Sequence, residues 1–113
     1  MKLLVFVLNE EEKLEEILEG FLEIGIKGAT VIESVGMGKI ISQDIPIFAG
    51  LRDLFASSSP HNRTIFSIIE DEMVEKTIHI INKIMGDIKE EPGKGILFFL
   101  NVDMFISAEK KLI

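Results

Sequence analysis

The chain has 113 residues, a net charge of −7 and 47% apolar residues. This length predicts one domain, and the apolar content excludes a disordered protein. Because the chain has no Cys, disulfides, thiolate zinc sites and cysteine nucleophiles are excluded, and a cytoplasmic location is predicted. The negative charge without a Lys/Arg cluster argues against a nucleic-acid partner, and no run approaches the ~20 apolar residues of a membrane span.

The first third of the chain predicts a strand, a helix and a second strand. Leu3 to Leu8 is a continuous apolar run, as in buried strands. Asn9 and Glu12 have the spacing of a capping box, which predicts the start of a helix. Gly25 is expected to end this helix in the left-handed conformation, and 29–35 is the second strand. The apolar stripe of the helix consists of Leu14, Ile17, Leu18, Phe21 and Leu22.

Residues 39–61 form a connection much longer than the usual 4–6 residues or so. Apolar residues at positions 47, 48, 51, 54 and 55 have helical spacing and predict a short helix, which would pack against a neighbouring subunit. Residues 57–60, three serines and a proline, are typical of a turn. This long segment is therefore the first place to look for contact with another protein.

The second half of the chain repeats the order strand, helix, strand. Residues 64–69 form an apolar strand, and the acidic residues 70–72 suit the beginning of a helix that Gly86 ends. Residues 96–102 form the last strand, and the tail 103–113 has no predicted element. The predicted buried face of the second helix is Val74, Ile78, Ile81 and Met85, with Thr77 and Ile84 beside it.

The order βαββαβ predicts an α+β fold, the ferredoxin-like sandwich, as a single domain over residues 1–113. One four-stranded antiparallel sheet then has two helices on one face, and the first and third strands are central. The other face of the sheet would expose apolar residues such as Phe98 and Leu100. Covering this face predicts an oligomer.

Three segments together resemble the PII nitrogen-regulatory signalling proteins. Residues 25–38 read Gly-Ile-x-Gly-x-Thr-Val-x-Glu-x-x-Gly-x-Gly, which is similar to the second-strand segment of that family. Residues 68–75 resemble the junction of the third strand and second helix, and residues 93–96 resemble the glycine-containing loop before the fourth strand. The resemblance covers most of residues 1–102.

The resemblance implies a homotrimeric regulatory protein and not an enzyme. It implies ATP or ADP, or another small anionic ligand, in the clefts between subunits, and a loop at 39–61 that docks on a target transporter, enzyme or regulator. Glycines let backbone N–H groups approach phosphate oxygens closely. By position, the resemblance assigns nucleotide contacts to Thr30, Gly36, Met37, Gly38, Gly93, Lys94 and Gly95.

The chain also departs from the family pattern at its cations. Ile96 stands where the family has a Lys, and the family's two Arg residues after the fourth strand align near Ser107 and Glu109. The chain has no Tyr, so uridylylation of a loop tyrosine is excluded. These departures identify a divergent member in which ATP or ADP binding is open, with Lys94 as the cation left to meet a phosphate.

Several alternatives remain open from the residues alone. The segment 36–38 is also compatible with a plain bend or bulge, and 93–95 with a loop that only turns the chain. The chain could be a ligand-independent trimeric interaction module whose segment 39–61 is a fixed packing arm. A third interpretation is a CutA-like trimer associated with a metal, although His61 and His79 have no converging carboxylates and no metal site is predicted. No catalytic residues are predicted.

Overall fold

The computed structural model describes residues 1–41 and 61–108. The helix predicted over 47–55, the turn predicted over 57–60 and the last five residues of the tail lie outside these ranges. None of the described helices is long and apolar enough to cross a membrane. The elements are β1 (Lys2–Leu8), the 3-10 helix η1 (Glu11–Lys13), α1 (Leu14–Ile24), β2 (Thr30–Ser34), α2 (Met37–Lys39), β3 (Asn62–Ile69), the 3-10 helix η4 (Asp71–Met73), α3 (Val74–Met85) and β4 (Gly95–Asn101).

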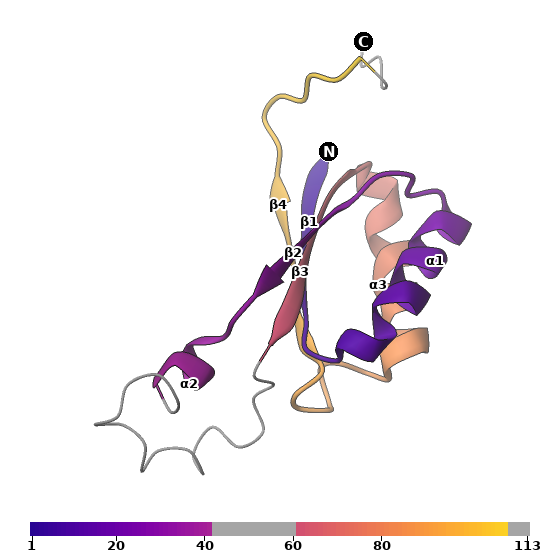
Figure 1. Cartoon of the computed structure of the whole chain (residues 1–113). Helices are drawn as coiled ribbons and strands as arrows, with labels where there is room; N and C mark the ends of the chain where they lie inside the picture. Colours follow the sequence, from indigo (N-terminus) through magenta and orange to yellow (C-terminus); the bar gives the residue numbers. More distant parts are fainter. Residues whose placement is uncertain (42–60, 109–113) are drawn as a thin grey trace.

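The four strands form one antiparallel sheet in the order β2-β3-β1-β4. The first and third strands of the chain, β1 and β3, are central, and β2 is an edge strand, as predicted. Helices α1 and α3 lie on one face of the sheet (Figure 1). This arrangement confirms the ferredoxin-like α+β fold.

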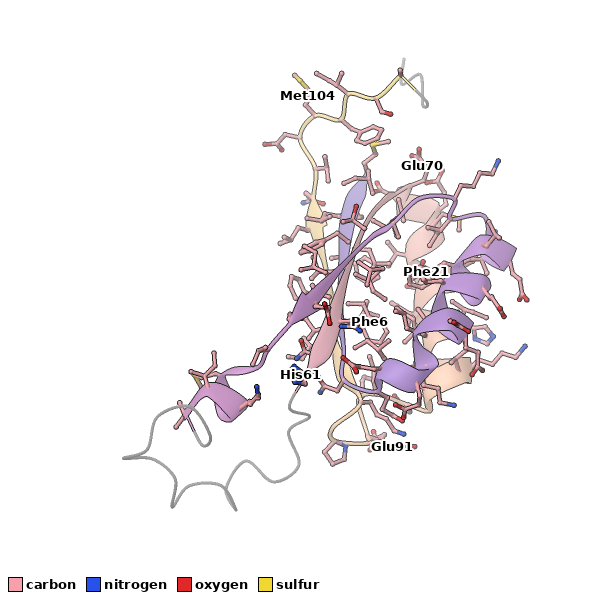
Figure 2. The ribbon with its side chains drawn as sticks, in the orientation of Figure 1. Phe6, Phe21, His61, Glu70, Glu91 and Met104 are labelled. Carbon is pink, nitrogen blue, oxygen red and sulfur yellow. The ribbon has the colours of Figure 1, made fainter. Side chains whose placement is uncertain are left out.

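The core lies between the helices and the sheet. Alternate residues of β1 point toward the helices, so Leu4, Phe6 and Leu8 are completely buried. Figure 2 shows Phe21 of α1 and Phe6 in the space between the two layers. The helices approach closely because Gly20 has no side chain: a Cβ there would lie 2.9 Å from Ile80 Cγ1.

The helix ends differ in part from the sequence prediction. Gly25 ends α1 with φ 104°, in the left-handed conformation that the sequence predicts. The capping box of Asn9 and Glu12 is wrong, because the helical segment begins with η1, whose N-cap is Glu10 and has no side-chain capping bond. The Asn9 side chain instead accepts a hydrogen bond from Asn62 Nδ2 at 3.4 Å. A contact from a distant strand thus replaces the local cap.

Two apolar residues of the helices also lie elsewhere than expected. Leu22 was placed on the buried stripe of α1, but 64% of its surface is exposed. On α3 the prediction missed Ile80 and included Ile78, which is only half-buried. The buried residues of α3 are Thr77, Ile80, Ile81 and Met85.

The other face of the sheet carries an apolar surface that no described helix covers (Figure 1). On β4, Ile96, Phe98 and Leu100 are 61%, 42% and 51% exposed. Ile32 on the edge strand is 47% exposed. We call this surface the open face. Contiguous apolar surface of this kind is typical of protein–protein interfaces.

The tail after β4 continues away from the body of the molecule (Figure 1). The Val102 N–H donates to the Met1 carbonyl oxygen at 3.2 Å, which anchors the start of the tail beside β1. Met104 and Ile106 are 76% and 86% exposed. Phe105 and Ser107, on the alternate positions, line a pocket that is described below.

Candidate functional site

Six of the predicted ligand contacts lie at one end of the sheet. The turn 36–38 follows the end of β2, and the loop 93–95 leads into β4. The strand register runs from Glu33 to Arg63, then to Leu8 and to Gly95, across all four strands. Figure 2 shows His61 and Glu91 at this same end. We call it the glycine end, and it comprises 36–38, Asn62 and 93–95.

The sixth, Met37, projects from the same turn and is 69% exposed. At 36–38, where the sequence is also compatible with a plain bend or bulge, Gly36 is extended, with φ −76° and ψ 155°, and a short helical turn begins after it. Neither Gly36 nor Gly38 has a positive φ. A Cβ on Gly36 would meet only Asn62 Nδ2, at 3.9 Å. Within the described residues, neither the backbone nor packing therefore requires glycine at position 36.

The loop 93–95 needs its glycines for the fold. Gly93 and Gly95 have φ values of 85° and 154°, which side chains rarely adopt. A Cβ on Gly95 would lie 2.4 Å from the Val7 carbonyl oxygen, closer than any real contact. The Asn9 N–H also donates to the Lys94 carbonyl oxygen at 3.2 Å. The interpretation of this loop as a segment that turns the chain therefore accounts for both glycines.

The Lys94 ammonium is engaged by two carboxylates. Its Nζ lies 2.9 Å from Glu10 Oε1 and 3.5 Å from Glu91 Oε2. The hydrogen bond to Glu10, followed by the attraction of Glu10 and Glu91, raises the pKa of Lys94. Glu10 Oε1 is buried and makes no hydrogen bond of good geometry beyond this ion pair. We call these three residues the Lys94 cluster. A phosphate would have to compete with both carboxylates for the ammonium.

Neutral polar groups line the other half of the glycine end. Ser34 Oγ donates to Asn62 Oδ1 and lies 2.8 Å from Thr64 Oγ1. Asn62 is only 7% exposed and connects this pair to Asn9. The sequence prediction missed Asn62, since a single Asn at the start of an apolar strand carries no recognisable signal. The structure finds it because three segments meet there.

Thr30 lies apart from the other predicted contacts. It pairs with Phe66 in the sheet, and six residues of extended chain separate it from Gly36, which corresponds to about 20 Å. Thr30 instead borders a surface pocket of about 740 Å³. We call this the tail pocket. Its lining includes Leu3, Gly28, Thr30, Phe66, Glu70 and Phe105.

The segment before Thr30 is fixed to the sheet by a buried serine. Ser67 is 4% exposed, and its Oγ donates to the Gly28 carbonyl oxygen at 2.6 Å. Ser107, which stands where the resemblance predicts a family arginine, also lines the tail pocket. Ile96, which stands in place of a family lysine, is 61% exposed on the open face. One departure from the family pattern thus lies at the tail pocket, and another lies on the open face.

The described residues offer no metal centre. Within 1–41 and 61–108, no three His, Asp or Glu side chains converge closely enough to hold an ion. His79 is exposed on α3, and His61 lies at the glycine end. The site chemistry that the described part of the chain presents is therefore hydrogen bonding and ion pairing.

The comparisons with known proteins agree with the fold and the segments above. The family model for the nitrogen regulatory protein P-II matches residues 1–110, nearly the whole chain. Comparison with curated proteins gives no match. Members of this family are regulatory signalling proteins without enzymatic activity. The chain belongs to the P-II nitrogen regulatory protein family.

Proposed function

We propose that the chain is a homotrimeric, cytoplasmic PII-type regulator. It binds an adenine nucleotide or another small anionic ligand between subunits, and it passes this signal to a partner protein through the segment 39–61. Members of the family typically form homotrimers and act on target proteins. The proposal extends these properties to this chain.

The observation that carries the proposal is the separation of Thr30 from the glycine end. The family resemblance assigns both regions to one ligand site, yet about 20 Å of extended chain divides them. A single subunit therefore cannot close its site. A neighbouring subunit that brings its own tail pocket against the glycine end would complete it.

The open face supports assembly of such a trimer. Its exposed aromatic and aliphatic residues lie on the two edge strands, β2 and β4, on the side of the sheet away from α1 and α3. Removing this surface from water stabilises an assembly by about 25 cal/mol for each Å² of apolar area. Residues at both ends of the edge strands would then lie at subunit boundaries.

The assembly is tested by sedimentation velocity of the wild type and of Phe98→Glu. The wild type is expected to sediment as a trimer, and the charged side chain on the open face should give monomers. Leu22→Glu is the matched control, since it places the same charge on an exposed leucine of α1 and should leave the trimer intact. A monomeric wild type would contradict the proposal.

Ligand binding is tested by calorimetric titration of the purified trimer with adenosine, AMP, ADP and ATP. Binding with one site for each subunit is the expected result. If none of the four binds, the nucleotide part of the proposal is wrong, and a trimer that still forms would then point to the ligand-independent interaction module.

A further inference from the structure

A second ion-pair group lies at the glycine end, beside the Lys94 cluster. Arg63 Nη1 is 2.8 Å from Glu33 Oε1 and 3.4 Å from Glu11 Oε1. The Arg63 and Lys94 side chains are each 25% exposed, so both charges are partly shielded from water. The register brings Arg63 next to Leu8, which in turn pairs with Gly95 at the start of β4.

Both cations are therefore outnumbered by the carboxylates that hold them. In each group, two glutamates face one cation, which leaves one negative charge in excess. A phosphate near either group would meet this excess, and its negative charges would be repelled. Arg63 and Lys94 stabilise the fold's own carboxylates and do not attract an anion.

The buried polar group nearest the turn 36–38 is neutral. Asn62 Nδ2 carries two hydrogens, and the bond to Asn9 Oδ1 uses one of them. Its amide lies beside Gly36, 3.9 Å from the position that a Cβ would take there. A neutral donor of this kind can bond one hydroxyl, ring nitrogen, carbonyl or phosphate oxygen, but it brings no positive charge to balance further phosphates.

One cation beside the turn is not held by any described carboxylate. Lys39 directly follows Gly38 and makes no ion pair with the described residues. A single half-exposed lysine suits one phosphate. A monophosphate carries about −1.5 to −2 charges at pH 7, and a di- or triphosphate carries more.

We propose that this site selects a nucleoside or a nucleoside monophosphate over the corresponding di- and triphosphates. The inference rests on the proposed function, because it concerns the same site between subunits. It follows from the two glutamate-held cations, from the neutral Asn62 amide, and from Lys39, which no described carboxylate pairs. The ligand's sugar and base, and not a chain of phosphates, would then supply most of the contacts.

The titration series of adenosine, AMP, ADP and ATP tests this selectivity, with each ligand measured in EDTA and again in magnesium chloride. AMP or adenosine should bind tightest, and each phosphate beyond the first should weaken binding about tenfold. Tighter binding of ADP or ATP than of AMP, in either buffer, would overturn this inference and leave the proposed function standing. Failure of all four ligands to bind would contradict both.

A double variant tests whether the Lys94 cluster causes the selectivity. Glu10→Gln with Glu91→Gln frees the Lys94 ammonium, and the affinity for ATP should rise about tenfold, while that for AMP changes less than about threefold. Glu19→Gln with Glu23→Gln removes the same charge from the exposed face of α1. An equal gain in the control, or no gain in the test variant, would show that the Lys94 cluster does not set the selectivity.

Discussion

The turn 36–38 and the loop 93–95 share the pattern Gly-x-Gly and lie at the same end of the sheet, but they differ in backbone and surroundings. Both glycines of the loop have positive φ, and Gly95 touches the backbone of β1. Gly36 has an ordinary extended conformation, and among the described residues only Asn62 Nδ2 lies within 4 Å of its Cβ position. The fold therefore requires glycine at positions 93 and 95. Within the described residues, it does not require glycine at position 36.

This difference separates structural from functional glycines. A glycine with a positive φ or a backbone neighbour is needed by a single folded chain. A glycine without either is most simply explained by something that approaches from outside, such as a ligand or another subunit. We therefore propose ligand contact for 36–38 and a role in chain geometry for 93–95, and matched substitutions can test this proposal.

The largest effect is expected from Gly95→Ala. Its Cβ would meet the Val7 carbonyl oxygen, and its φ is strained for alanine, so the free energy of unfolding should fall by about 3 kcal/mol. Gly36→Ala is the matched control and should change this free energy by less than about 0.5 kcal/mol. Urea unfolding of both variants measures the difference. Equal losses of unfolding free energy in the two variants would show that the fold needs both glycines alike.

An effect of intermediate size is expected from Gly36→Val on ligand binding. The side chain has room within the subunit but would fill the approach to the Asn62 amide, so affinity for the best nucleotide should fall at least about tenfold, or 1.4 kcal/mol. Calorimetric titration measures this loss. The control Val35→Ala alters an exposed neighbour and should bind normally. Unchanged affinity in Gly36→Val would show that the turn does not contact the ligand.

The smallest effect is expected from Lys94→Met on stability. The raised pKa of Lys94 means that its ion pairs stabilise the fold fully below the unfolded-state pKa of about 10.5. This contribution disappears as the pH rises through the higher folded-state pKa. The melting temperature of the variant should therefore be slightly below that of the wild type at pH 8, and the gap should close at strongly alkaline pH.

Lys89→Met, in the same polar loop, is the control for that measurement. Lys89 is exposed and makes no ion pair with the described residues, so its removal should not change the melting temperature at either pH. A gap for Lys94→Met that stayed constant across this range would mean that the lysine acts through packing and not through its charge.

The sequence predicts the sheet well because its information is local. A continuous apolar run marks the central strand β1, and glycine after a helical stripe marks the end of α1. The predictions of a helix cap at Asn9 and of a buried Leu22 are wrong because both depend on contacts that are not local in the sequence. The Asn9 side chain accepts a hydrogen bond from Asn62, 53 positions away, and 64% of the Leu22 surface is exposed.

The site is predicted only in part for the same reason. The glycines and Thr30 form a recognisable sequence pattern, but the residues that lie near them in the fold are distant in the sequence. Glu10 looks like one more solvent-exposed acid before the first helix, yet its buried oxygen binds Lys94. The contacts of single residues such as Asn62 and Arg63 can be recognised only when the register of β3 is known.

The account's central claim is that one ligand site combines Thr30 of one subunit with the turn 36–38 of the next. Mixing two variants tests it directly. Thr30→Val and Gly36→Val, each expected to bind poorly alone, are unfolded together in equal amounts and refolded into mixed trimers, and ligand binding is titrated.

A site shared between subunits predicts that the mixture regains tight binding at about one quarter of its sites, because each of the two positions is filled by an intact residue half of the time. Trimers of either variant alone should regain none. If the mixture binds no better than the separate variants while trimers of both chains form, the site lies within one subunit and the account is wrong.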